Sequence, residues 1–98
     1  MQLGANAYLS KRSEEELEQI RAYIEGEFGK SSAQKFLEKI NKAIQRIESH
    51  PESNPPTRRH NSLRRCSIKP YIVLFCQIVL DEIEIVAIVD SRRDFIEP

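Results

Sequence analysis

Charged residues crowd into one short stretch near the C-terminal end, directly after an apolar segment. The sequence AIVDSRRDF spans residues 87 to 95 and places two arginines between two aspartates. Arginines can hold phosphate or carboxylate groups, and a carboxylate can accept a proton during catalysis. The stretch could therefore be a catalytic cluster, a partner-binding site, or the polar end of a strand.

RNA cleavage is the chemistry that this cluster suggests first. It needs a base for the 2′-hydroxyl, an acid for the leaving oxygen and cations for the phosphate. Four arginines could supply the cations: Arg64, Arg65, Arg92 and Arg93. A base is harder to find, because His60 lies in a proline-rich loop and the charges nearest Asp90 favour its ionised, ion-paired form. His60, Asp90 and Arg93 are candidates for catalysis, but a structural Asp-Arg pair explains Asp90 better.

Charge is unevenly spread along a chain whose net charge is zero. Between residues 57 and 77 there are five basic residues and no acid: Arg58, Arg59, Arg64, Arg65 and Lys69. A local basic stripe on a neutral protein suits one acidic partner, whereas general nucleic-acid binders are strongly basic. We predict that five residues contact a partner or target: Arg64, Arg65, Lys69, Arg92 and Arg93. A solvated surface is the alternative.

Several functional classes lack their sequence signals. The two cysteines and two histidines show no metal-binding spacing, and the three glycines form no phosphate loop, so we expect no metal and no cofactor. The chain has no apolar run long enough for a bilayer and no signal peptide at its start, so we expect a cytoplasmic protein without a membrane partner. Cys66 and Cys76 should then be reduced, and a hairpin near Pro70 would place Cys66 opposite Val73.

Hydrophobic spacing indicates the elements in the first half of one domain that spans residues 1–98. Residues 5–11 could form a short strand. Two helical patterns follow, each opening on a capping box that begins at Ser13 or Ser31. Gly29 ends the first helix and Pro51 stops the second. The short link between them predicts an antiparallel helix hairpin.

The second half predicts three strands within residues 63–69, 71–80 and 83–90, joined by short links with a turn at Asp81-Glu82. The fold class is therefore α+β: a strand, a helix hairpin and an antiparallel three-stranded meander. The last two strands are apolar on both faces, but a helix hairpin covers only one face of a sheet. We expect a partner protein or a second copy on the other face, ahead of coverage by the N-terminal strand and chain ends.

A series of residues recurs in a familiar order along the chain. The series consists of Ser10, then Glu16-Leu17, Ile20, Tyr23 and Ile24, then Ala33 and Phe36, His50-Pro51, Leu63-Arg64-Arg65, Tyr71 to Phe75, and Asp90 with Arg92-Arg93-Asp94. It resembles the RelE/ParE superfamily of type II toxins, which includes plasmid stabilisation proteins, from about residue 8 to residue 95. The resemblance implies a β-α-α-β-β-β fold and a growth-inhibiting toxin that a cognate antitoxin holds inactive.

The superfamily has branches with different targets. RelE-like members cleave mRNA on the ribosome, using basic residues with a C-terminal tyrosine or a histidine, and the closing region here has neither. The ParE-like branch, associated with inhibition of DNA gyrase, is more similar. The resemblance therefore implies a ParE-like gyrase inhibitor without catalysis of its own. The alternatives are a ribosome-dependent mRNA endonuclease and a non-toxic fold relative, and the assembly could be a homodimer or a toxin–antitoxin hetero-oligomer.

Overall fold

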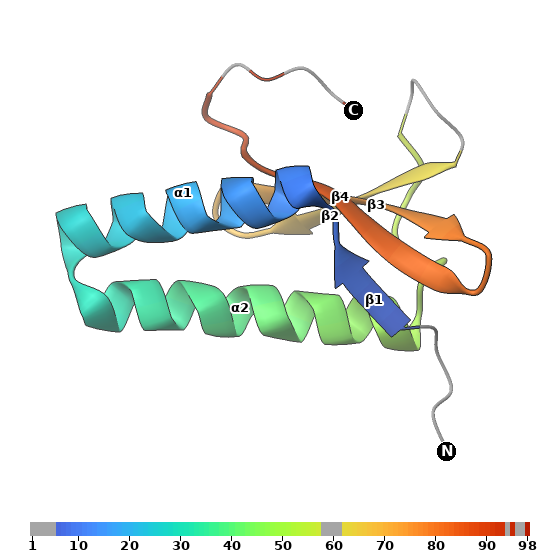
Figure 1. The fold of residues 1–98 in the computed structure, drawn as a ribbon, viewed down its shortest axis with the longest axis horizontal. Coiled ribbons are helices and arrows are strands. Elements are labelled where there is room, and N and C mark those ends of the chain that lie inside the picture. Colours follow the sequence, from blue (N-terminus) through green and yellow to red (C-terminus); the bar gives the residue numbers. More distant parts are fainter. Residues whose placement is uncertain (1–5, 58–61, 94, 96–97) are drawn as a thin grey trace.

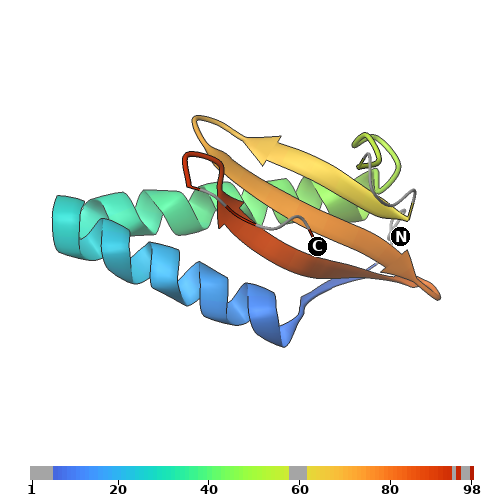
Figure 2. The same ribbon diagram turned by 90° about the horizontal axis from the view of Figure 1, so that it is seen from above.

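The computed structural model describes residues 6–57, 62–93, 95 and 98. The elements run β1 (Asn6–Leu9), α1 (Lys11–Phe28), α2 (Lys30–Ser49), β2 (Leu63–Ile68), β3 (Ile72–Val79) and β4 (Glu82–Asp90). The two helices form an antiparallel hairpin on one face of a single sheet (Figures 1 and 2). This is the predicted α+β arrangement.

The four strands form one mixed sheet in the order β1-β4-β3-β2. Strands β2, β3 and β4 are the predicted antiparallel meander. Strand β1 pairs in parallel with β4, so that Asn6 lies opposite Glu82 and Leu9 lies opposite Ile85. This order makes β3 and β4 the central strands, which explains why both are apolar on two faces.

The main core lies between the helix hairpin and the sheet. Its buried residues include Phe36, Ile40 and Ile47 from α2 and Leu74, Ile83, Ile85 and Ile88 from the strands. In α1 the buried residue is Ser13, while the apolar stripe of that helix is only partly buried. Helix α2 is thus the central helix, and α1 lies at the margin of the sheet. Neither helix in the described part of the chain is both long and apolar enough to cross a membrane.

The chain itself covers the second face of the sheet, which corrects the expectation of a partner there. Val73, Phe75, Ala87 and Val89 form a second cluster, and each is at most 6% exposed. Phe95 packs against this cluster with its ring centroid 6.0 Å from that of Phe75. The expectation failed because the pattern of apolar residues shows that a face is buried, without showing what buries it.

Both helices begin earlier than the predicted capping boxes. Helix α1 is capped by Ser10, whose Oγ accepts a hydrogen bond from the Ser13 N–H at 3.1 Å. Helix α2 begins directly after Gly29, which has a φ of 93°, and Ser31 lies inside it. Both boxes were wrong because a Ser-x-x-Glu or Ser-x-x-Gln spacing also occurs within a first helical turn. The predicted helix ends, at Gly29 and before Pro51, are confirmed.

The two cysteines are buried free thiols on the helix side of the sheet. Cys66 lies opposite Leu74 and Cys76 lies opposite Arg64, so the register differs by one residue from the predicted pairing of Cys66 with Val73. Burial raises the pKa of Cys76 to about 11. Because the thiolate is the reactive form, this thiol is a packing residue at neutral pH.

Candidate functional site

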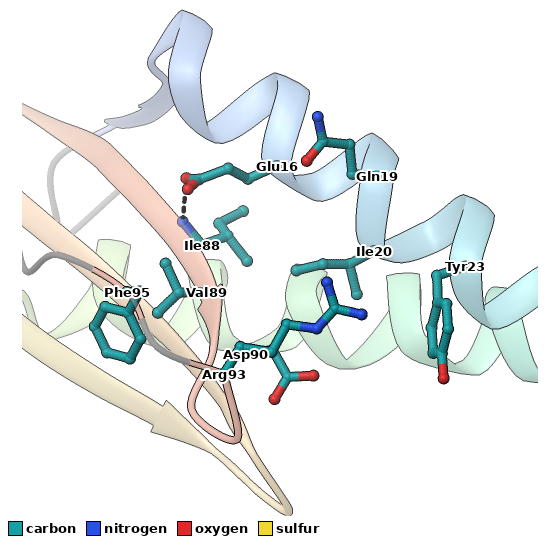
Figure 3. Close-up of a pocket in the computed structure, with 9 residues that line it drawn as sticks. All are labelled: Glu16, Gln19, Ile20, Tyr23, Ile88, Val89, Asp90, Arg93 and Phe95. Atoms are coloured by element: carbon teal, nitrogen blue, oxygen red, sulfur yellow. Dashed lines mark hydrogen bonds between the residues drawn. The ribbon is translucent and has the colours of Figure 1, made fainter.

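A hollow of about 310 Å³ opens between α1 and the C-terminal end of β4 (Figure 3). Its lining includes Glu16, Ile20 and Tyr23 from α1, together with Val89, Asp90, Arg93 and Phe95 from the end of β4 and the residues that follow. We call it the strand-end hollow. It contains two of the predicted site residues, Asp90 and Arg93.

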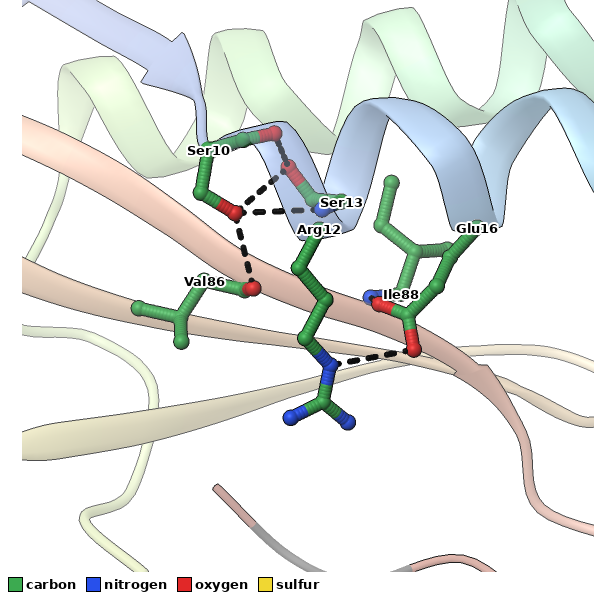
Figure 4. Close-up of polar contacts among 6 residues, drawn as sticks. All are labelled: Ser10, Arg12, Ser13, Glu16, Val86 and Ile88. Atoms are coloured by element: carbon green, nitrogen blue, oxygen red, sulfur yellow. Dashed lines mark hydrogen bonds and ion pairs between the residues drawn. The ribbon is translucent and has the colours of Figure 1, made fainter.

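Polar groups of α1 and of its N-cap residue Ser10 hold this helix against the outer edge of β4 (Figure 4). Strand β1 pairs with β4 only as far as Ile85. Beyond that point, the Ser10 N–H donates to the Ile85 oxygen at 3.0 Å and the Ser10 hydroxyl donates to the Val86 oxygen at 2.9 Å. The Glu16 carboxylate then accepts a hydrogen bond from the Ile88 N–H at 3.0 Å. These bonds continue the edge pairing and fix the α1 wall of the hollow.

The chain turns sharply after β4, and Asp90 organises the turn. Its Oδ1 accepts hydrogen bonds from the Arg92 N–H at 2.9 Å and from the Arg92 Nε at 3.1 Å, and its Oδ2 accepts one from Nη2 at 2.7 Å. The side-chain hydrogen bonds from Arg92 lower the pKa of Asp90. The carboxylate is therefore held ionised with both oxygens engaged, as expected for a structural ion pair.

The two neighbouring arginines contact different aromatic rings. The guanidinium carbon of Arg92 lies 3.5 Å from the ring centroid of Tyr71, while that of Arg93 lies 5.7 Å from the centroid of Tyr23 in α1. Arg92 lies over the ring of Tyr71 and forms an ion pair with Asp90. Arg93 extends along α1 between Ile20 and Tyr23 (Figure 3), and no carboxylate within the described residues forms an ion pair with it. Arg93 is thus a cation that lines the strand-end hollow.

Arg64 lies elsewhere and anchors the loop that follows α2. Its Nη1 donates to the carbonyl oxygen of Asn54 at 2.7 Å and to that of Glu52 at 3.2 Å. The same loop runs beside β2, where the Thr57 N–H donates to the Leu63 oxygen at 2.8 Å. Arg64 therefore binds backbone groups of its own chain and lies outside the strand-end hollow.

The structure does not gather the remaining predicted contact residues into one patch. Arg65 lies over the ring of Phe75 on the second face of the sheet, at 6.0 Å from the centroid. Lys69 lines a different hollow, between α2 and the β2–β3 turn. The candidate His60 lies outside the described residues, as does Asp94. Among the described residues, no group of three histidine, cysteine, aspartate or glutamate side chains could hold a metal ion.

Sequence reasoning missed the contribution of α1 to the site. Glu16, Gln19 and Tyr23 line the hollow from one side of this helix, next to its apolar stripe. Their spacing of three and four residues places them on one helical face, which was a usable signal. The signal could not be interpreted, because nothing local indicates that this face lies along the edge of β4.

The series of elements and the strand-end turn together invite comparison with known proteins. The sequence pattern of the ParE toxins of type II toxin-antitoxin systems, parDE, matches residues 7–95. The chain belongs to the ParE toxin family. The match covers the described helices and strands from Ala7 of β1 onward and ends at Phe95 in the strand-end hollow. It confirms the predicted RelE/ParE resemblance and the ParE-like branch.

A solved structure agrees with this assignment at the level of the fold. This ParE-like toxin superposes on a chain of the "Chromosomal ParDE TA system from P. aeruginosa" with a TM-score of 0.76 at 12% sequence identity. The superposition covers 92% of this chain and 98% of that chain. A search of curated protein sequences found no match.

Proposed function

We propose that this ParE-like toxin inhibits DNA gyrase by binding it, without catalysis of its own, and that a cognate antitoxin neutralises the toxin. The family supports the toxin class, and the similar solved chain comes from a system that also contains an antitoxin. The observation that carries the proposal is the strand-end hollow. It presents the cation Arg93 beside apolar walls, while both carboxylates that line it, Glu16 and Asp90, are engaged.

The state of these carboxylates supports binding over RNA cleavage. A general base works best when its pKa lies near the working pH and when it can reach the proton. The pKa of Asp90 is lowered, and Arg92 occupies both of its oxygens. Glu16 accepts hydrogen bonds from the Ile88 N–H and from Arg12 Nε. A cation beside an apolar wall is, in contrast, a common basis for recognition between proteins.

A supercoiling assay tests the proposal. Purified toxin is titrated into DNA gyrase acting on relaxed plasmid, beside the charge reversals Arg93→Glu and Lys42→Glu. Lys42 lies on α2, away from the strand-end hollow, and controls for net charge. We expect wild type and Lys42→Glu to block supercoiling or to accumulate cleaved plasmid, and Arg93→Glu to need roughly tenfold more protein.

Two outcomes would contradict the proposal. If folded wild-type toxin had no effect on gyrase at large excess, gyrase would not be the target. If mRNA showed position-specific breaks within minutes of induction, the endonuclease alternative would replace it. An equal loss of potency in Arg93→Glu and Lys42→Glu would remove the strand-end hollow as the contact site while leaving gyrase as the target.

A further inference from the structure

The β3–β4 turn exposes three large apolar side chains in succession. Ile78 is 43% exposed, Val79 is 40% exposed and Leu80 is 92% exposed. Leu80 also has a φ of 57°, a left-handed backbone conformation that is costly for a leucine. Exposed apolar side chains that lie together commonly mark an interaction site, and backbone strain is concentrated at functional positions. We call residues 78–82 the hairpin tip.

Two acidic residues follow the exposed leucine of the hairpin tip. Asp81 and Glu82 are both exposed, and neither forms an ion pair with another residue that the structure describes. The hairpin tip therefore combines an apolar side chain with two negative charges that no cation in the described residues balances. A surface complementary to it would be an apolar hollow bordered by cations.

Such a hollow, of about 340 Å³, lies between the helix hairpin and the β2–β3 turn. Its apolar walls include Phe28 and Phe36 from the helices. Three lysines also line it, and its lining contains no acidic side chain: Lys35, Lys39 and Lys69. We call it the lysine-rimmed hollow. None of the three lysines forms an ion pair within the described part of the chain, so their charges repel one another until an opposite charge arrives.

The hairpin tip and the lysine-rimmed hollow lie at opposite ends of the molecule (Figures 1 and 2). The β2–β3 turn precedes β3 and the β3–β4 turn follows it, so the eight residues of this strand separate the two surfaces by roughly 26 Å. The hairpin tip therefore cannot reach the hollow of its own chain, but it can reach the hollow of a second copy. A contact between two different surfaces of identical chains is heterologous and can repeat from copy to copy.

We propose that the hairpin tip of one copy inserts into the lysine-rimmed hollow of a second copy, so that the free toxin associates head to tail. Leu80 contacts Phe28 and Phe36, while the two carboxylates that follow Leu80 face the lysines of the rim. Phe28, which is 64% exposed in the single chain, is covered by this contact. Apolar match and opposite charge carry the proposal together, and neither depends on the target of the toxin.

Sedimentation velocity of the full chain over a series of concentrations tests the inference. We expect the average mass to rise with concentration above that of one chain, and to rise less as salt is added. Leu80→Asn and Lys39→Glu should each weaken the association roughly tenfold. Leu80→Met keeps an apolar side chain at the tip and should associate as wild type does. Lys42→Glu is the matched control and should stay within about twofold of wild type, because Lys42 lies on the same helix but does not line the hollow.

A mixture of two variants tests which surfaces meet. Leu80→Asn keeps an intact hollow and Lys39→Glu keeps an intact tip, so each should be monomeric alone at concentrations where an equimolar mixture forms a one-to-one complex. Circular dichroism checks that both variants are folded.

Four outcomes would overturn the inference: a wild type that stays monomeric at every concentration, a mixture that does not associate, association that Leu80→Asn leaves unchanged, and an equal loss in Lys42→Glu and Lys39→Glu. Sedimentation contains no gyrase, so this inference and the proposed function fail separately.

Discussion

At the scale of single residues, a few polar side chains decide where α1 lies and how the chain turns after β4. Ser10 and Glu16 bind backbone groups of β4 that β1 leaves without a partner. Asp90 binds both the backbone and the side chain of Arg92, two residues later. Each of these contacts satisfies a polar group next to the strand-end hollow, so each can be tested through stability.

Replacement of Glu16 should show how much the hydrogen bond that it accepts from the Ile88 N–H contributes to the free energy of unfolding. Ile88 is 1% exposed, so Glu16→Ala removes the protein partner of a buried backbone donor. We expect the free energy of unfolding to fall by about 1 to 2 kcal/mol in urea denaturation. Glu16→Gln keeps an acceptor and should lose less. The exposed neighbour Glu15 is the control, and a loss in Glu15→Ala as large as that in Glu16→Ala would contradict the explanation.

The Asp90–Arg92 ion pair should make stability depend on pH. The pKa of Asp90 is lowered in the folded protein, so its contribution is complete above the unfolded-state pKa of about 3.9 and is lost as the pH falls through the folded-state pKa. We expect Asp90→Asn to lose about 1 kcal/mol or less at neutral pH and nothing in strong acid. Urea denaturation at both pH values measures this difference.

Asp81 provides the control for that experiment, since it lies exposed in the β3–β4 turn and forms no ion pair with the described residues. Asp81→Asn should match wild type at each pH. A constant deficit of Asp90→Asn across the pH range would assign the effect to the shape of the turn and not to charge. Asp90→Asn should also retain the effect on gyrase, because the carboxylate has no catalytic part in the proposed function.

At the scale of elements, both edge strands of the sheet are partly occupied by the chain itself. The Ala7 N–H of β1 donates to a Glu48 oxygen at 2.9 Å. The loop after α2 pairs with the outer edge of β2, where the Arg65 N–H donates to the Pro55 oxygen at 2.9 Å. Such contacts limit the addition of further strands. The proposed contact with gyrase therefore uses a side-chain surface, the strand-end hollow, and not a strand edge.

The β3–β4 hairpin contains a conformation that its sequence does not favour. Leu80, not the predicted Asp81-Glu82, begins the turn, and it has a φ of 57° with its side chain 92% exposed. This left-handed conformation is costly for a leucine and easier for asparagine. We expect Leu80→Asn to raise the free energy of unfolding by about 0.5 to 1 kcal/mol in urea. Leu80→Ala keeps most of the cost and should change little. A destabilised Leu80→Asn would mean that the leucine side chain contributes packing.

At the scale of the whole molecule, the net charge is zero, but the two helices carry opposite charges. Helix α1 carries six glutamates and three basic residues, whereas α2 carries five basic residues and two glutamates. The strand-end hollow lies along α1, whereas the hollow that Lys69 lines is also lined by Lys35 and Lys39 of α2. The two hollows therefore lie in different local electrostatic fields.

Local interactions made much of the fold predictable. Strand and helix periods, the glycine at the end of α1 and the proline after α2 act over a few residues, so the elements and their order followed from the sequence. The series of spaced residues also led to the correct family. The charged turn after β4 was visible as well, because Asp90 and Arg92 are only two residues apart.

Contacts between distant segments were settled only by the tertiary structure. The bonds from Ser10 to Val86 and from Ile88 to Glu16 join residues 76 and 72 positions apart, and no local pattern indicates them. The parallel pairing of β1 with β4 and the cover that Phe95 provides for the second face are of the same kind. Apolar spacing shows that a face is buried, but its partner depends on how the whole chain packs. For that reason the sequence indicated a cationic site, and the fold decided that Arg93 and Lys69 belong to different hollows.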